Sequence, residues 1–219
     1  MNPRRRAQRA VLSRDRVLAA AVELADEHGL DAVSMRRVGV SLGVEAMSLY
    51  RHVHNKDDLL DGMVDDVIAR FPARDEAVGW RESLRGLVRG AHSVLLAHPW
   101  AAGLATSRPA VGPARLRFVD AVIGTLLAGG CSPQLAHDAM HAVEVHVFAF
   151  TLQELRLQVG PSAHGYPLDE LLSGAGAAAY PHLAATLAVA EHDHVAEFEF
   201  VLELLIVGIE RAISTSVGG

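Results

Sequence analysis

The sequence has little of what would fix a disulfide-bonded or membrane-bound fold. One cysteine, Cys131, occurs among the 219 residues, which excludes a disulfide framework and a four-cysteine zinc site. No apolar run reaches the roughly 18–20 residues that a membrane span needs. No apolar core follows the arginine-rich residues 1–16, so this stretch is not a secretory signal. We therefore expect a protein of a reducing compartment, the cytoplasm, with no membrane partner.

The sequence also lacks the usual signatures of an enzyme. No phosphate-binding loop and no dinucleotide fingerprint occurs. Cys131 stands just before Ser132-Pro133 in an expected turn, so a Cys-His or Ser-His-Asp site has no local support. Half of the residues are apolar and 21% are charged, which is typical of a folded globular chain. We expect no enzymatic activity and no cofactor.

Basic residues are concentrated at the N-terminal end. Residues 1–56 carry a net charge of +4 and the remaining residues carry −10, which together make the net charge of −6. The only lysine, Lys56, ends the basic region. A basic end on an acidic body favours a small module that contacts a polyanion. The alternative is a solvated arm with chance clustering of arginine.

The pattern of apolar residues predicts an all-α fold. Apolar positions recur at helical spacing, and strand-like alternation is absent. Ser13 and Ser34 are suited to cap helices, Gly29 to end the first one, and Gly43 to form a turn. The expected helices cover residues 14–28, 35–42, 44–52, 57–71, 80–97, 113–128, 133–158 and 195–214, with an irregular connection at 159–181.

Two short helices around Gly43 predict a helix-turn-helix, whose second helix, residues 45–52, can lie in the major groove of DNA. Leu49 and Val53 would pack inward. Side chains on the outer face would contact bases and phosphates, and Lys56 would bind a phosphate at the start of the next helix. The predicted DNA-binding residues are Arg36, Arg37, Ala46, Met47, Ser48, Tyr50, Arg51, His52 and Lys56.

These residues resemble the DNA-binding domain of TetR-family transcriptional repressors. The resemblance is carried by Leu42-Gly43-Val44, Ser48-Leu49-Tyr50-Arg51-His52-Val53 and Asn55-Lys56-Asp57-Asp58. One departure is Gly39, where alanine is usual; glycine within a helix costs about 0.5–1 kcal/mol. The expected domains are a basic arm with a helix-turn-helix DNA-binding domain, 1–56, and a helical effector-binding and dimerisation domain, 57–219.

The rest of the chain is similar to the tetracycline-repressor type of C-terminal domain. The similarity is carried by Trp80-Arg81-Glu82-Ser83-Leu84, His98-Pro99-Trp100, Ser107-Arg108-Pro109 and residues 202–210. The resemblance implies a homodimer formed through the last two long helices, a palindromic operator in double-stranded DNA, and release by a small molecule. Where tetracycline–magnesium-binding members have a histidine and a glutamate, this chain has Leu104 and Gln153, so we expect no metal ligand there.

An effector pocket is expected between the helices that follow Trp80. Its walls would be mainly apolar with a few polar anchors, which suits a small, largely apolar molecule. The same Met and Phe positions are also typical of a plain hydrophobic core. The candidate effector-binding residues are His92, Trp100, Leu104, Ser107, Phe118, Asp120, Met140, His141, Glu144, Phe148 and Gln153.

Twelve histidines leave an alternative open, a helical metal-binding or enzymatic protein that uses the His-rich C-terminal region. His141 and His146 lie about 140° apart on one helix, so they cannot share a metal there. The second cluster, residues 191–194, flanks an expected helix start. Structural or solvated roles are the simpler interpretation. A DNA-binding activator or architectural protein would share the first domain, and the sequence does not separate it from a repressor.

Overall fold

The computed structural model describes residues 11–108, 111–159, 178–190 and 193–216, and within these ranges it contains helices and no strand. The prediction of an all-α fold is therefore confirmed. The helices, in chain order, are α1 Arg14–His28, α2 Met35–Leu42, α3 Ala46–Leu49, α4 Lys56–Ile68, α5 Trp80–Ala97, α6 Pro99–Ser107, α7 Pro113–Ala128, α8 Pro133–Val145, α9 Thr151–Val159, α12 Pro181–Leu187 and α13 His194–Ser216, with a 3-10 turn at Leu30–Ala32 and a π-helical segment at His146–Phe150.

Side-chain caps explain where the N-terminal helices begin. The hydroxyl of Ser13 accepts a hydrogen bond from the backbone N–H of Arg16, and the hydroxyl of Ser34 accepts one from that of Arg37. The side chain of Asn55 caps α4 in the same way. These bonds satisfy N–H groups that the first turn of a helix leaves free. α2 ends at Gly43, whose φ of 67° is left-handed and favours glycine.

The structure corrects two predicted helices and adds one that was not predicted. α3 covers only Ala46–Leu49 and turns continue to His52, so the expected helix 44–52 is too long. α6 was not predicted, because Pro99 was taken as a stop, whereas proline suits the first position of a helix. The expected helix 133–158 is interrupted by the π-helical segment. Most of the connection expected at 159–181 lies outside the described residues.

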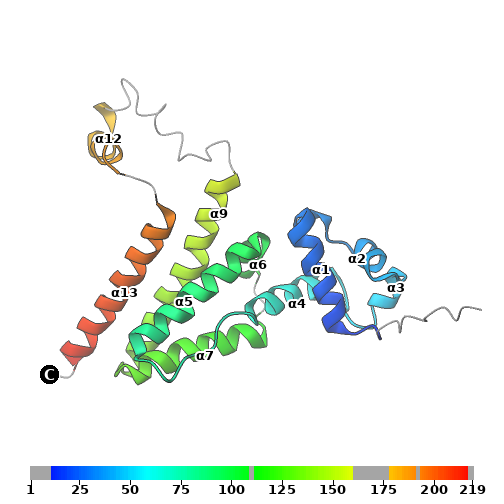
Figure 1. The fold of residues 1–219 in the computed structure, drawn as a ribbon, viewed down its shortest axis with the longest axis horizontal. Helices are drawn as coiled ribbons and strands as arrows, with labels where there is room; N and C mark the ends of the chain where they lie inside the picture. The colour runs from blue at the N-terminus through cyan, green and yellow to red at the C-terminus, as the bar shows by residue number, and fades with distance from the viewer. Residues whose placement is uncertain (1–10, 109–110, 160–177, 191–192, 217–219) are drawn as a thin grey trace, which may run out of the picture.

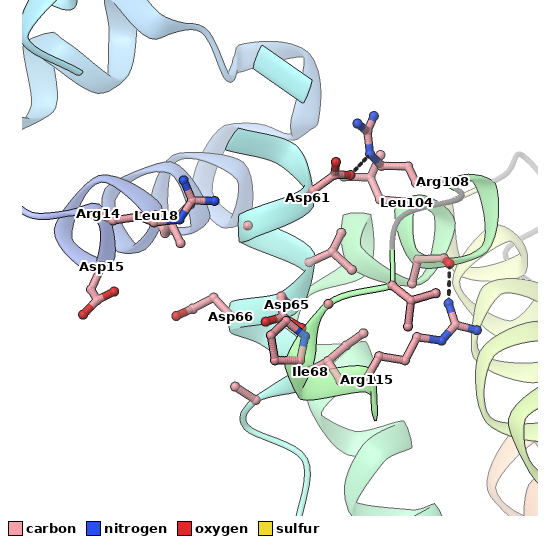
Figure 2. Close-up of a pocket in the computed structure, with 17 residues that line it drawn as sticks. Arg14, Asp15, Leu18, Asp61, Asp65, Asp66, Ile68, Leu104, Arg108 and Arg115 are labelled. Carbon is pink, nitrogen blue, oxygen red and sulfur yellow. Dashed lines mark hydrogen bonds and ion pairs between the residues drawn. The ribbon is translucent and has the colours of Figure 1, made fainter. Parts of the chain in front are cut away.

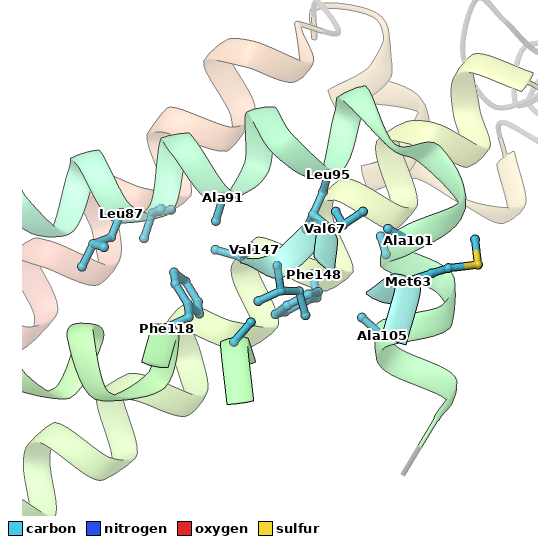
Figure 3. Close-up of a cluster of buried hydrophobic side chains, with 14 of the residues drawn as sticks. Met63, Val67, Leu87, Ala91, Leu95, Ala101, Ala105, Phe118, Val147 and Phe148 are labelled. Atoms are coloured by element: carbon cyan, nitrogen blue, oxygen red, sulfur yellow. The ribbon is translucent and has the colours of Figure 1, made fainter. Parts of the chain in front are cut away.

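α4 joins two groups of helices. Figure 1 shows α1, α2 and α3 at one end of the molecule, α13 at the other, and α4 between them. α4 packs against α1 on one side and against α5, α6 and α7 on the other. Its buried residues Met63 and Val67 belong to a continuous core with Leu87 and Leu95 of α5 and Phe148 of the π segment (Figure 3). Because each fully buried side chain of this size contributes about 1.5–3 kcal/mol, this core stabilises the packing of α4 against the larger group of helices.

α13 is aligned on α5 by a row of ion pairs. Arg81, Arg85 and Arg89, one turn apart on α5, pair with Glu210, Glu203 and Glu199 of α13. The Arg85 guanidinium binds both carboxylate oxygens of Glu203, at 2.6 and 2.8 Å. Partly exposed pairs contribute little individually, about 0–1 kcal/mol each. Their main effect is to fix the register of the two helices.

None of the described helices combines the length and the apolar character that crossing a membrane requires.

Candidate nucleic-acid interface and effector region

The helix-turn-helix depends on a close approach between α2 and α3. A Cβ atom on Gly39 would lie 2.9 Å from the carbonyl oxygen of Val44 and 3.2 Å from the backbone nitrogen of Ala46. Gly39 therefore allows the backbone of α2 to approach the start of α3. By helix propensity alone this glycine only costs stability; its close approach to Val44 and Ala46 is a packing reason for its presence.

α3 buries one side and exposes the other. Leu49 and Val53 are buried, as predicted. Met47 is 75% exposed and Tyr50 is 44% exposed. Of the other predicted DNA-binding residues, Arg36, Arg37, Arg51 and Lys56 are exposed, and Ala46, Ser48 and His52 are half-buried. The structure thus places the whole predicted set on α2, on α3 and its following turn, and at the start of α4.

We call residues 46–52, which form α3 and the turn after it, the recognition segment. An arginine of α1 that the sequence did not indicate holds the end of this segment. Arg14 of α1 donates a hydrogen bond to the carbonyl oxygen of His52, at 2.8 Å, and another to Asp58 Oδ1, at 2.6 Å. The other oxygen of Asp58 accepts the backbone N–H of His54, at 2.7 Å. The Arg14 guanidinium holds the pKa of the Asp58 carboxyl below its usual value. Because 44 residues separate Arg14 from Asp58, no local spacing indicates this contact.

A second polar network joins α1 to the larger group of helices. The carboxylate of Asp26 in α1 lies 2.9 Å from Nδ1 of the buried His98, and it accepts a hydrogen bond from Trp100 Nε1 at 2.7 Å. Arg70, just after α4, lies 2.9 Å from the other ring nitrogen of His98. The predicted effector residue Trp100 is thus bonded to the DNA-binding end. The network therefore links α1, the end of α4 and the start of α6.

The predicted effector residues do not surround a single cavity. Phe118, Met140 and Phe148 are buried in the common core, and Phe118 and Phe148 both pack against Phe71. Asp120, His141 and Gln153 are exposed, and so is Ser107, whose hydroxyl bonds to a carbonyl oxygen of α6. Glu144 pairs with Arg115 at 3.2 Å. Leu104 lines a cavity at the junction of α1, α4 and α6 (Figure 2).

His92 lies in a buried layer where α5, the π segment, α9 and α13 meet. Its ring stacks on Phe198, with centroids 4.0 Å apart, and His146 stacks on the same ring at 4.3 Å. His92 Nδ1 is 2.7 Å from the Thr151 hydroxyl, and its Nε2 is 3.3 Å from Glu154 Oε2. Burial lowers the pKa of His92 to about 4 and lowers that of His146. Burial also raises the pKa of the Glu154 carboxyl.

Two buried histidines with lowered pKa values should make stability fall in weak acid. Below the usual histidine value of 6.5, the unfolded chain gains a proton that the folded chain does not, so stability is lost as pH falls from 6.5 toward 4. One histidine contributes about 1.4 kcal/mol per pH unit at most. We expect the free energy of unfolding to fall less between pH 7 and pH 5 in His92→Gln than in the wild type, by about 1–2 kcal/mol.

Urea unfolding at one fixed protein concentration measures this difference. His137→Gln is the matched control, because His137 is exposed on α8. The raised pKa of Glu154 works in the opposite direction near pH 5, since a protonated carboxyl favours the folded state there. The wild type and the His137→Gln control share this contribution. An identical pH slope for His92→Gln and the wild type would contradict the prediction.

The described residues hold no group of three or more His, Cys, Asp or Glu side chains placed to bind a metal ion. His137 and His141 contact each other edge to face, 4.7 Å apart, on the surface of α8. His194 pairs with Glu197 within α13. Residues 191 and 192 of the second histidine cluster lie outside the described ranges.

A helix-turn-helix with an exposed recognition helix, joined through α4 to a larger helical domain, is the arrangement of a DNA-binding regulator. The family comparisons agree. Residues 17–63 match the model of bacterial regulatory proteins of the tetR family, and residues 71–213 match the tetracyclin repressor-like C-terminal domain. The chain belongs to the TetR family of transcription regulators. It has the fold of a TetR-family repressor, with a helix-turn-helix N-terminal part and a tetracyclin repressor-like C-terminal domain.

Named relatives are similar over part of their length. The chain is 34% identical to the HTH-type transcriptional repressor DrrR1 of Streptomyces coeruleorubidus over 155 residues, 70% of this chain and 57% of that protein. It is 40% identical over 122 residues to an HTH-type transcriptional regulator of Saccharopolyspora erythraea, 55% of this chain and 51% of that protein. The chain thus spans between half and three fifths of the length of these relatives.

Solved structures match over nearly the whole chain. A possible TetR-family regulator of Streptomyces coelicolor A3(2) has a TM-score of 0.76 and 35% identity, over 91% of this chain and all of that one. The Streptomyces coelicolor TetR-family protein ActR, in complex with actinorhodin, has a TM-score of 0.79 and 30% identity, over 93% of this chain and 99% of that one.

Proposed function

We propose that this protein is a repressor that binds a palindromic operator as a homodimer and is released by a small, largely apolar molecule. The observation that carries the proposal is the recognition segment. It exposes Met47 and Tyr50 on a surface flanked by cationic side chains, while Leu49 and Val53 anchor it to the domain. An apolar or phenolic side chain beside arginines suits contacts to thymine methyl groups, guanine edges and phosphates.

The surface of α13 supports a dimer. Phe200, Leu204 and Val207 are 65%, 55% and 49% exposed. At 100° per residue they form one stripe, opposite to the buried side of the helix. Beside this stripe, a groove of about 390 Å³ lies between α13 and the α8–α9 region, and Gln153 and Val145 are among the residues that line it. A large exposed apolar surface is typical of a protein interface. A second copy would pair α8 and α13 with their counterparts and place two recognition helices about 34–36 Å apart.

Three observations support an effector of largely apolar character. The predicted walls Phe118, Met140 and Phe148 meet in the apolar core between α4, α7, α8 and the π segment. π-helical segments within α-helices are often found at functional sites. The similar structure of ActR holds actinorhodin. An effector that binds the non-DNA-binding arrangement about a hundredfold more tightly shifts the equilibrium by about 2.7 kcal/mol.

The proposal is tested by selecting the fragments of the source genome that the purified protein binds, at several salt concentrations, beside Tyr50→Ala. We expect one or a few palindromic sites that the variant loses, and genes next to them that indicate the effector. Uniform, salt-sensitive coating of DNA by both proteins would instead indicate an architectural protein. No DNA retained by either protein would favour the alternative of a metal-binding or enzymatic role.

Arg36 and Lys56 are expected to contribute differently to operator binding. Arg36 is exposed early in α2, where it can reach a guanine edge, whereas Lys56 is exposed at the start of α4, where it can bind a phosphate. Arg36→Ala should cost about 1–3 kcal/mol on the operator and little on random DNA. Lys56→Ala should weaken both alike and reduce the salt slope by about one. Titrations on both DNAs measure this; equal losses for both variants on both DNAs would contradict the division.

A further inference from the structure

A cavity of about 450 Å³ lies where the DNA-binding helices meet the larger domain. Figure 2 shows its lining side chains on α1, on α4, on α6 and at the start of α7. Its apolar wall is formed by Leu18, Val64, Ile68, Leu104, Val111 and Pro113. This volume is in the range of small-molecule sites, which are typically 300–1,000 Å³. Leu18 and Ile68 connect this wall to the apolar core, but Phe118 and Phe148 are not among the residues that line the cavity.

The cationic side chains around this cavity already have anionic partners. Arg14 pairs with Asp58 at 2.6 Å, and Arg115 pairs with Glu144 at 3.2 Å. Arg108 pairs with Asp61, which itself lines the cavity, and with Asp57 at 3.2 Å. Each guanidinium charge is therefore compensated before any ligand arrives.

The other acidic side chains that line the cavity can accept further hydrogen bonds. Asp15, exposed in the first turn of α1, makes no hydrogen bond or ion pair within the described ranges. Asp65 uses Oδ1 to accept the backbone N–H of Ala114, at 2.8 Å. Asp66 pairs with Arg70 through Oδ2, at 2.7 Å. A carboxylate can accept more hydrogen bonds than these, so the cavity combines an apolar wall with an excess of acceptors and negative charge.

We propose that this junction cavity is a binding site for a small organic ammonium ion, a primary amine on an apolar body, and that its occupancy changes operator affinity. The apolar body packs on the Leu104 side, and the ammonium donates to the carboxylates of α1 and α4. Charge-assisted hydrogen bonds of this kind are stronger than neutral ones. The site lies outside the core in which the largely apolar effector was placed above.

The cavity can couple ligand binding to DNA binding because its walls come from both parts of the molecule. α1 belongs to the DNA-binding end, whereas Leu104 and Arg108 belong to the larger domain. Arg14 lines the cavity and also holds the carbonyl oxygen of His52 at the end of the recognition segment. A ligand that fixes the separation of α1 and α6 therefore changes the position of that segment. This coupling rests on the operator binding proposed above; binding of the amine by itself does not.

Isothermal titration calorimetry without DNA tests the site, with 4-phenylbutylamine as the probe and 4-phenylbutan-1-ol as its neutral analogue. We expect saturable binding of the amine at about millimolar or tighter Kd and at least about tenfold weaker binding of the alcohol. No saturable binding of the amine, or equal binding of both compounds, would overturn the site.

Three variants locate the binding. Asp15→Asn removes the carboxylate without breaking an ion pair, and it should weaken the amine about fivefold or more while leaving the alcohol unchanged. Ala69→Phe, at an exposed position on the cavity edge, should block both compounds. Asp138→Asn makes the same charge change on the exposed face of α8 and should have no effect. Unchanged amine binding in both cavity variants would place the amine elsewhere and overturn the site.

Operator titrations with saturating amine then test the coupling. We expect the operator Kd of the wild type to change at least about threefold, and that of Asp15→Asn to change less at the same amine concentration. An unchanged operator Kd in the wild type, with calorimetric binding intact, would overturn the coupling and leave the site. Failure to bind any operator in the absence of amine would instead count against the proposed function.

Discussion

Leu204→Glu is expected to make the protein monomeric and to weaken operator binding by about 100-fold or more. Leu204 is 55% exposed at the centre of the apolar stripe of α13. In a symmetric dimer each substitution occurs twice, so two carboxylates without partners would be buried together, at a cost of several kcal/mol. A monomer presents one recognition helix and loses the gain of binding both half-sites at once.

Sedimentation equilibrium and operator titration measure the two effects in the same samples. Leu116→Glu is the matched control: Leu116 is 60% exposed on α7, away from the stripe, and its substitution should leave both mass and affinity unchanged. A Leu204→Glu protein that remains a dimer would show that α13 is not the interface. A monomeric variant with wild-type operator affinity would show that dimerisation does not support DNA binding.

The second large effect is expected at Arg14. Arg14→Met removes the hydrogen bonds to the His52 carbonyl and to the Asp58 carboxylate, and it leaves both acceptors without this partner. We expect operator binding to weaken about tenfold and the free energy of unfolding to fall by about 1–2 kcal/mol, since the pair is partly exposed. We attribute the weaker operator binding to a recognition segment that is no longer held in place, and not to the loss of a phosphate contact.

Salt dependence and the partner residue distinguish these two explanations. If Arg14 positions the segment, the salt slope of Arg14→Met stays that of the wild type, whereas loss of a phosphate contact would reduce it. Asp58→Asn removes a negative charge, which by charge alone would strengthen DNA binding. Positioning predicts that it weakens binding, because Arg14 and the His54 N–H lose their anionic acceptor. Arg16→Met is the control, because it makes the same charge change on α1 but two residues further along, on another face of the helix. Stronger binding by Asp58→Asn would contradict the positioning role.

Local signals in the sequence were sufficient to predict most of the fold. Ser34 and Gly43 delimit α2 by a side-chain cap and a left-handed turn, both of which depend on residues within a few positions. The inward packing of Leu49 and Val53 also followed from helical spacing. The start of α6 and the π-helical segment did not follow in this way. A proline can begin a helix as well as end one, and a π turn depends on how its neighbours pack.

What the sequence by itself determined is therefore the class of fold, the helix-turn-helix and the inward packing of Leu49 and Val53, because each rests on contacts within one or two helical turns. The tertiary structure decided which distant groups meet. It placed Asp58 against Arg14, His98 between Asp26 and Arg70, and His92 on Phe198. In the tertiary structure Phe118 and Phe148 are buried in the core, and a cavity lined by charged and apolar side chains lies at the domain junction. These outcomes depend on how helices far apart in the chain pack, and no spacing along the sequence specifies that.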